Sequence, residues 1–118
     1  MSEREVLAAA YRDFNARNID AVIAQMHPQV EWANGMEGGH VLGKDAVRDY
    51  WARQFTMFNP RVDPTSIEAD GSDGWVVTVH QVVHDMKGNL LLDTTVYHTY
   101  RFRDGFIARM DITQSSPG

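Results

Sequence analysis

The sequence predicts an α+β domain, in which three N-terminal helices pack on the concave face of a curved, mainly antiparallel sheet. Two observations lead to this prediction. Apolar residues repeat at helical spacing in three segments of the first half, and they alternate at the strand period of two in the second half. A chain of 118 residues can bury one core but not two, so residues 1–118 are expected to form a single domain.

Composition excludes several classes of function. Sixteen acidic residues against eleven basic ones leave a net charge of −5, which argues against nucleic acid or a membrane surface as a partner. The absence of cysteine excludes disulfides, thiolate metal sites and a cysteine nucleophile. The N-terminus lacks the layout of a signal peptide, and no apolar run is long enough to span a membrane, so a cytoplasmic protein is expected.

Helical periodicity marks three segments. The first covers residues 3–17, with acidic residues in its first turn, where they suit the helix dipole. Asn18 is expected to cap a second, shorter helix that continues to Met26 and ends before Pro28. The third covers residues 44–58 and carries a broad aromatic stripe.

A short strand is predicted at residues 30–34, followed by a glycine-rich connection at 35–43. Glu37 and His40 lie in this connection. Two interpretations remain open for it: a lid over a pocket, or an ordinary polar loop.

Three further strands are predicted beyond the third helix. Pro60 and Pro64 confine the strand at about 62–69 to an edge or to irregular pairing. The strands at 75–85 and 91–102 are long, and a last strand extends to Ile112. A two-residue loop within 87–89 would place odd residues of the first long strand beside even residues of the second.

The register decides which side chains share the concave face. The two-residue loop places Gln81 on the same face as His98. At the next turn we expect a three-residue loop with Gly105 in a left-handed conformation, because a two-residue loop would bury Arg109 and Asp111. The three-residue loop instead directs four residues of the last strand inward: Phe106, Ala108, Met110 and Ile112.

In this order of elements the chain resembles the SnoaL-like branch of the NTF2-like superfamily, which includes ketosteroid isomerase and polyketide cyclases. The matching segments are residues 15–20 (NARNID), 27–32 (HPQVEW), 43–51 (GKDAVRDYW) and 98–105 (HTYRFRDG). The resemblance implies a cone with a pocket between the concave sheet face and the first and third helices. Because this superfamily contains several kinds of enzyme and also binding modules, fold alone does not fix the activity.

The face assignment predicts a mostly apolar pocket with a few polar groups, as is usual for a small-ligand site. His98 and Asn34 are the candidate catalytic residues. The expected substrate-binding residues are Tyr11, Trp32, Tyr50, Trp51, Gln54, Val79, Gln81, Val96, Tyr100, Ala108 and Met110. No metal and no cofactor are expected, and no nucleotide-binding glycine pattern is present.

His98 is the preferred acid/base, because an imidazole in an apolar pocket stays neutral and can accept a proton. The alternative is a structural histidine bonded to a neighbour in the core. By resemblance, Asn34 stands where ketosteroid isomerase has its aspartate base, and His98 matches the isomerase's protonated aspartate. The isomerase tyrosine falls on Ala10, or on Tyr11 if the helix is shifted by one. Since an amide cannot act as a base, Asn34 is expected to orient a carbonyl or a water.

The outer sheet face is expected to mediate homodimerisation, since it is too apolar to remain in water over its full extent. The residues concerned are Val76, Thr78, Val82, Thr95, Tyr97 and Thr99. On the same face His84 is predicted opposite Asp93, with His80 nearby. A salt bridge is preferred there over a zinc site.

Two functions therefore compete at this point. The first is cofactor-free acid/base catalysis on a small, largely apolar carbonyl or hydroxyl compound, of isomerase, cyclase, dehydratase or hydrolase type. The second is a non-catalytic module that binds a small apolar ligand or another protein.

Overall fold

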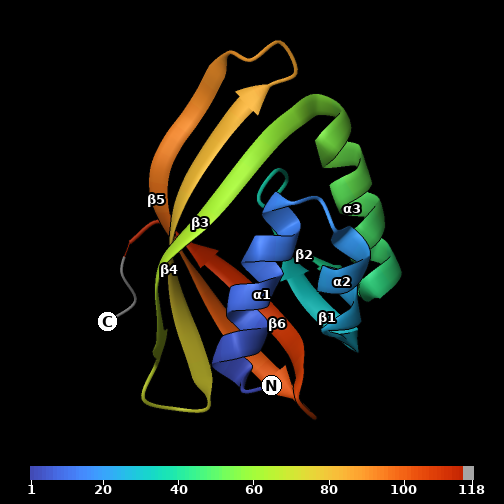
Figure 1. Ribbon diagram of the computed structural model, residues 1–118. Coiled ribbons are helices and arrows are strands. Elements are labelled where there is room, and N and C mark those ends of the chain that lie inside the picture. Colours follow the sequence, from blue (N-terminus) through green and yellow to red (C-terminus); the bar gives the residue numbers. More distant parts are fainter. Residues whose placement is uncertain (116–118) are drawn as a thin grey trace.

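The computed structural model describes residues 1–115 and shows three helices against one face of a curved six-stranded sheet (Figure 1). The elements in chain order are α1 (Glu3–Asn15), α2 (Ile19–Ala24), β1 (Met26–Ala33), β2 (His40–Leu42), α3 (Lys44–Met57), β3 (Phe58–Ala69), β4 (Gly74–Asp85), β5 (Leu90–Arg103) and β6 (Phe106–Thr113). The strand order is β2-β1-β6-β5-β4-β3, and every pair is antiparallel except β1 and β6. The predicted α+β architecture is confirmed.

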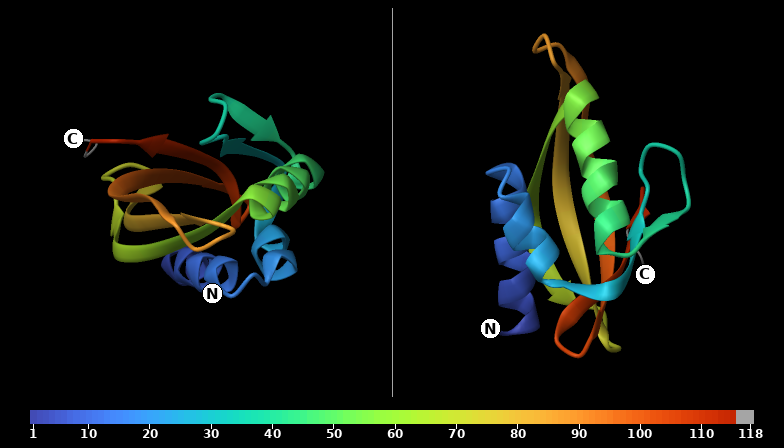
Figure 2. Two further views of the ribbon diagram at one scale, coloured as in Figure 1. Left: turned by 90° about the horizontal axis from the view of Figure 1, so that it is seen from above. Right: turned by 90° about the vertical axis from the view of Figure 1, so that its right-hand side faces the viewer.

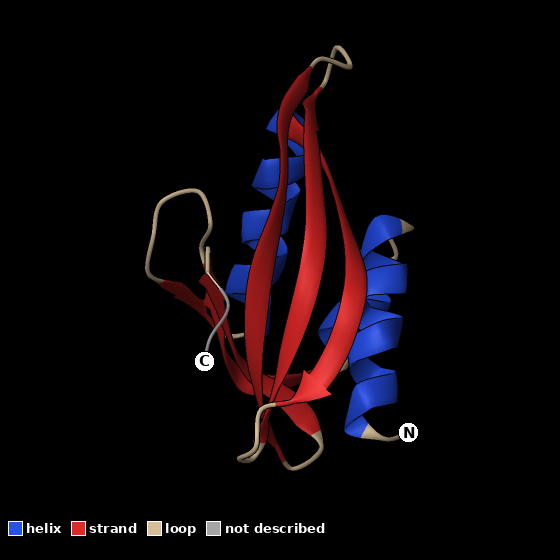
Figure 3. Ribbon diagram, turned by 90° about the vertical axis from the view of Figure 1, so that its left-hand side faces the viewer, coloured by secondary structure: helices blue, strands red, loops and turns tan. Residues whose placement is uncertain are grey.

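The sheet curves around the helices, so that its concave face and the helices enclose the core (Figure 2). Figure 3 shows the other face of the long strands with no helix in front of it. None of the helices among residues 1–115 is long and apolar enough to cross a membrane.

Helix α1 begins where its sequence supplies a complete N-terminal cap. The Ser2 side chain accepts a hydrogen bond from the Glu5 N–H, and the Glu5 carboxylate accepts one from the Ser2 N–H. The helix ends at Asn15, before Arg17, whose φ is 62°. Its apolar face, including Leu7 and Tyr11, is buried against the sheet.

The second helix is shorter than predicted. It ends at Ala24, and Met26 begins β1 opposite Ile107. The Asn18 side chain makes no capping hydrogen bond. Pro28 lies inside β1, where the pairing with β6 is irregular between Met26 and Glu31, so its missing N–H interrupts no regular ladder. Within the predicted glycine-rich connection, His40–Leu42 forms β2.

Strand β3 lies at the edge of the sheet, as its prolines predicted. Its pairing with β4 is irregular between Pro64 and Ser66. It begins at Phe58, directly after α3, and is therefore longer than predicted, with Pro60 inside it.

The β4–β5 pairing confirms that Gln81 and His98 share the concave face. Gln81 pairs with Thr94, and Val77 pairs with His98. The connecting loop was predicted wrongly: residues 86–89 separate the strands, and a bulge follows because Val83 pairs with Leu92 while His84 pairs with Leu90.

The β5–β6 turn, by contrast, is shorter than predicted. Asp104 and Gly105 have φ values of 54° and 83°, which is the two-residue turn with two left-handed residues, and Arg103 pairs with Phe106. Met110 and Ile112 still reach the concave face, because an irregularity between Arg101 and Phe102 restores the register.

Because of that irregularity, two residues of β6 that were predicted to point inward do not. Phe106 is 40% exposed, while Ile107 is fully buried opposite Phe102. Ala108 falls between the paired positions Ile107 and Arg109, so it belongs to the bulge rather than to the concave face.

Candidate functional site

A cavity of about 270 Å³ lies between the concave face of the sheet and helices α1 and α3. Nine of the residues predicted from the sequence line it: Tyr11, Trp32, Tyr50, Trp51, Gln54, Gln81, His98, Tyr100 and Met110. The cavity wall contains no Asp, Glu, Lys or Arg among residues 1–115. It is therefore an apolar site with a few hydrogen-bonding groups.

Aromatic rings hold the wall of the cavity in place. Trp51 of α3 packs edge-on against Trp32 of β1, with ring centroids 5.4 Å apart, and against Phe14 of α1 at 5.2 Å. Trp32 also contacts the ring of Tyr100 at 6.1 Å. Such contacts link α1, α3 and the sheet, so the cavity is largely formed before any ligand binds.

Three side chains in the cavity wall form a continuous hydrogen-bonded chain. The Tyr11 hydroxyl oxygen lies 2.7 Å from Nδ1 of His98 and 2.7 Å from the Tyr100 hydroxyl oxygen. Tyr11 comes from α1, whereas His98 and Tyr100 come from the same face of β5. All three residues are buried, with His98 7% exposed.

The second ring nitrogen of His98 reaches the cavity. Among residues 1–115, Nδ1 has the Tyr11 partner, and no hydrogen bond within the protein involves Nε2. Every fully buried side-chain nitrogen or oxygen in this part of the chain has a partner, so Nε2 cannot be fully buried. Because His98 lines the cavity, Nε2 is the ring atom that a ligand can meet.

Burial keeps the three groups neutral. It lowers the pKa of His98 from 6.5 to about 4, because an imidazolium would lose its hydration. Burial also raises the pKa of Tyr11 well above its usual value, with a further contribution from Tyr100, and raises that of Tyr100. At neutral pH the chain therefore holds one imidazole and two phenols without formal charge.

Neutrality allows two arrangements of protons. If Tyr11 donates to Nδ1, His98 presents an N–H at Nε2; if Nδ1 donates to Tyr11, His98 presents a lone pair there. Tyr11 then accepts from or donates to Tyr100, respectively. The same three side chains can thus offer the cavity either a hydrogen-bond donor or a base.

Asn34 lies outside the cavity wall of the described residues. Its side-chain oxygen accepts hydrogen bonds from the N–H groups of Met36 (3.0 Å) and Glu37 (2.9 Å), which shapes the turn after β1. The amide therefore stabilises the local backbone, as the side chain of a helix-capping residue does. Among residues 1–115 it has no place in the cavity wall from which it could orient a ligand.

Three further predicted residues belong to the core or to a bulge. Val79 and Val96 pair across β4 and β5 on the concave face, but other side chains cover them completely or nearly so. Ala108 is the bulged residue of β6. Face assignment alone could not separate covered positions from lining positions, because that depends on how the helices pack.

Sequence reasoning left several lining residues out of the site. Met36 and Gly35 line the cavity from the connection after β1, and Phe58 and Leu91 line it from element ends. The remaining ones are Ala10, Phe14, Val22, Ala33, Pro60, Val62, Val83, Leu92 and Ile112. Leu92 and Val83 were assigned to the correct face, so their register was a usable signal; the bulge at Leu91 left no signal in the sequence.

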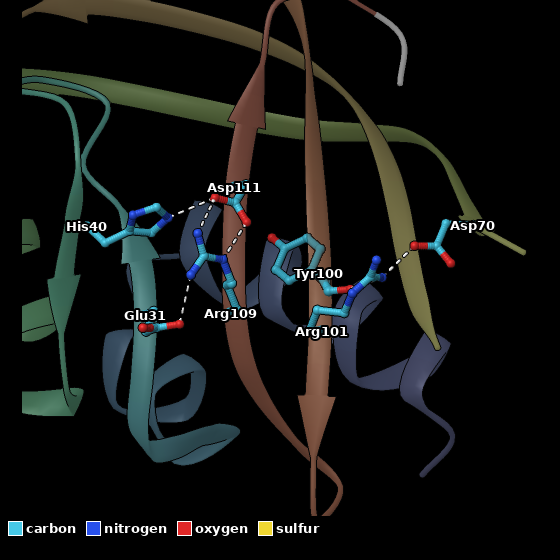
Figure 4. Close-up of polar contacts among 7 residues, drawn as sticks. All are labelled: Glu31, His40, Asp70, Tyr100, Arg101, Arg109 and Asp111. Carbon is cyan, nitrogen blue, oxygen red and sulfur yellow. Dashed lines mark hydrogen bonds and ion pairs between the residues drawn. The ribbon is translucent and has the colours of Figure 1, made fainter. Parts of the chain in front are cut away.

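His40, one of the two residues considered for a lid, forms an ion pair instead of lining the cavity. His40 belongs to β2, and its Nε2 lies 2.8 Å from Oδ1 of Asp111 (Figure 4). Arg109 lies between Asp111 and Glu31, with N–O distances of 2.8 and 2.9 Å, and lowers the pKa of the Asp111 carboxyl. These ion pairs tie β1 and β2 to β6.

On the outer face, Asp93 pairs with His80 and not with His84. His80 Nε2 lies 2.7 Å from Oδ1 of Asp93. The register explains the error, because the bulge places Val82, not His84, opposite Asp93. Both side chains of the His80–Asp93 pair are about half exposed.

An apolar cavity inside a cone of three helices and a curved sheet defines the NTF2-like class of proteins. Residues 7–110 match the SnoaL-like domain, and the chain therefore belongs to the SnoaL-like family. A search among curated proteins finds no match to this sequence.

Solved structures agree with this assignment. The chain is similar to TerC co-crystallised with polyporic acid, at 29% identity and a TM-score of 0.83, over 97% of this chain and 92% of that one. An NTF2-like protein from Burkholderia pseudomallei is 23% identical, with a TM-score of 0.84 over 98% and 92% of the two chains. A Mycobacterium tuberculosis protein in complex with estradiol-17beta-hemisuccinate is 18% identical, with a TM-score of 0.80 over 93% and 92%.

Proposed function

We propose that this protein binds a small, largely apolar carbonyl or hydroxyl compound in its cone and catalyses a proton transfer on it without a cofactor. The observation that carries the proposal is the neutral chain of His98, Tyr11 and Tyr100 in the cavity wall, with Nε2 of His98 reaching the cavity. TerC and the mycobacterial protein, which share the fold, were each crystallised with an organic ligand.

The geometry supports an enolisation that creates no net charge. Nε2 of His98 takes a proton from a carbon next to the ligand carbonyl, and the Nδ1 proton passes to the Tyr11 oxygen. The Tyr11 proton passes to the Tyr100 oxygen, and the Tyr100 proton passes to the ligand oxygen. The electron pair of the C–H bond becomes the C=C bond of the enol, while the carbonyl π pair forms the new O–H bond.

Distances fit this scheme. The ring centroids of His98 and Tyr100 lie 6.4 Å apart, both residues line the cavity, and each bond within the chain is 2.7 Å. In this scheme the carbonyl group and its neighbouring carbon lie against the cavity-facing edges of the two side chains, because the Tyr11 hydroxyl occupies the space between them. Because burial lowers the pKa of His98 to about 4, a stepwise route through an imidazolium is disfavoured, and the relay through Tyr11 avoids it.

The test is hydrogen exchange into a simple bicyclic ketone. Proton NMR of 1-tetralone in D₂O measures the exchange of its α-hydrogens, and the protein is expected to accelerate this exchange. His98→Asn, which keeps a group near Nδ1, and Tyr100→Phe, which removes the last donor, should each reduce the protein-dependent rate by about 100-fold or more. His80→Asn, on the outer face, is the matched control and should leave the rate unchanged.

The second candidate function is a non-catalytic binding module, and the same experiment separates the two. The cavity favours this candidate independently of His98, because its wall is apolar and carries no formal charge among the described residues. If 1-tetralone binds, as monitored by fluorescence of Trp32 and Trp51, but shows no protein-dependent exchange, the binding module is the better description.

The proposal extends to assembly: two copies are expected to associate through the outer faces of β4 and β5. Figure 3 shows that no helix covers this face. Its central residues Val76, Thr78 and Tyr97 are only partly buried in the single chain.

A further inference from the structure

Two leucines of β5 line the cavity, although each is about half exposed to water. Leu91 and Leu92 line the cavity and are 51% and 43% exposed. Leu90, next to them, is 58% exposed but does not belong to the cavity wall. An exposed apolar group beside a ligand site has a physical reason to be there if the ligand covers it.

The bulge in β5 is what brings two successive leucines to the same cavity. In a regular strand, neighbouring residues point to opposite faces, so only Leu92 would face inward. Because Val83 pairs with Leu92 and His84 pairs with Leu90, Leu91 is the extra residue and is redirected. Bulges beside sites commonly serve to re-aim a side chain.

Leu91 and Leu92, which we call the rim of the cavity, lie far from His98 along β5. His98 and Leu92 are six residues apart on β5, which corresponds to about 20 Å of extended strand. His98 is 7% exposed and Leu92 is 43% exposed, so the cavity runs along β5 from a buried hydrogen-bonded cluster to two exposed leucines, with Gln81 between them. Phe58 and Met36 line it as well, with Met36 41% exposed.

We infer that the ligand is an elongated neutral molecule, with one carbonyl or hydroxyl group at His98 and an apolar tail that reaches the Leu91–Leu92 rim. This inference rests on the proposed ligand site. Neutrality follows from the cavity wall, which offers no Lys or Arg to an anion and no Asp or Glu to a cation among residues 1–115. An anionic head group would lose its hydration without gaining a cationic partner.

The test uses 4-alkylphenols, which carry one neutral hydroxyl and a tail of adjustable length. Calorimetry with the 4-ethyl, 4-butyl, 4-hexyl and 4-octyl compounds is expected to show affinity rising about two- to four-fold for each added methylene. Leu92→Ser should weaken binding of 4-octylphenol about five-fold and leave 4-ethylphenol unchanged. The matched control is Leu90→Ser, on the same hairpin but outside the wall, which should change neither.

Several outcomes would overturn the inference. These are an affinity independent of tail length, equal effects of Leu90→Ser and Leu92→Ser, or 4-octylbenzoate binding as tightly as 4-octylphenol. A change in the sedimentation coefficient of the Leu92→Ser protein would instead indicate that the rim mediates association between copies. This result would equally overturn the inference.

The outcome is distinguishable from failure of the proposed catalysis. If the alkylphenol series behaves as expected while 1-tetralone shows no His98-dependent exchange, the ligand class stands and the catalytic role is wrong. If exchange depends on His98 but affinity is independent of tail length, the catalytic role stands and the ligand class is wrong.

Discussion

His98 is a titratable residue in an environment that opposes its charged form. Its ring is 7% exposed, and its one hydrogen-bonding partner among the described residues, Tyr11, is uncharged. The Tyr11 ring is also stacked with the imidazole: the ring centroids lie 5.9 Å apart, and the angle between the ring planes is 18°. Folding therefore holds the ring neutral, and this property affects stability as well as chemistry.

The depressed pKa of His98 predicts a loss of stability in mild acid. The unfolded chain binds a proton at His98 below pH 6.5, whereas the folded chain does so only near pH 4. Stability from the neutral ring is thus complete above pH 6.5 and is lost as the pH falls towards 4. Between pH 6.5 and 5 this loss amounts to about 2 kcal/mol.

Urea unfolding at pH 7 and pH 5 measures this contribution. His98→Asn protein should lose less unfolding free energy between the two pH values than the unaltered protein, by about 2 kcal/mol. His80→Asn, at a half-exposed position, is expected to retain the full loss. If the unfolding free energies of the His98→Asn and unaltered proteins changed equally between the two pH values, the ring would not be held neutral by the fold.

At this scale, the sequence predicted the face of His98 but not its partners. A period of two was enough to place His98 with Tyr100 and Gln81 on the concave side. The Tyr11 contact depends on how α1 packs against β5, which pattern alone does not determine. Asn34 shows the converse: it was predicted to end a strand at 30–34, one residue beyond the observed end of β1, yet its amide serves the backbone of the following turn.

At the scale of elements, two short irregularities decide which residues enter the site. The bulge at Leu91 adds a leucine to the rim, and the bulge at Ala108 returns Met110 and Ile112 to the concave face after a two-residue turn. The predicted three-residue turn was wrong, although Met110 was placed correctly. Bulges are stabilised by tertiary context, which explains why alternation did not reveal them.

The Asp104–Gly105 turn predicts opposite effects for two substitutions. Both residues have positive φ, a conformation that glycine adopts freely and asparagine tolerates better than most residues. Gly105→Ala should lower the unfolding free energy by about 1 kcal/mol, because alanine is strained there. Asp104→Asn should leave it unchanged or raise it slightly.

Thermal or urea unfolding of these two variants checks the turn assignment. Gly71→Ala provides a comparison in another turn, because Gly71 has a φ of 84° and an added Cβ would meet open space there. If Gly105→Ala were as stable as the unaltered protein, the two-residue turn with two left-handed residues would be incorrect. The register of β6, and with it the placement of Met110, would then need revision.

At the scale of the whole molecule, the parallel β1–β6 pair closes one side of the cone. The strand order, the short β2 and this parallel pair were not derivable from alternation, since they depend on contacts between distant segments. Ion pairs from Arg109 to Glu31 and Asp111 lie along this seam (Figure 4). The order of helices and strands, by contrast, was predictable because each has its own periodicity.

The outer face of the sheet predicts association of two copies. Tyr97 lies at its centre, paired with Thr78 of β4 and Thr113 of β6, and is only partly buried in the single chain. The His80–Asp93 pair lies on the same face, so these two groups are already matched within each copy. Sedimentation at micromolar concentration is expected to show a dimer.

Tyr97→Asp should dissociate this dimer, because a two-fold interface would bury the unpaired carboxylate of each copy, and the dissociation constant should rise about 100-fold or more. Leu42→Asp is the matched control: it places the same charge at an exposed position on β2, at the opposite edge of the sheet, and should leave the dimer intact. A monomer in the unaltered protein at these concentrations, or equal effects of the two substitutions, would contradict association through β4 and β5. Since the cavity lies on the concave side and its wall is formed within one chain, the Tyr97→Asp monomer should still bind 4-octylphenol.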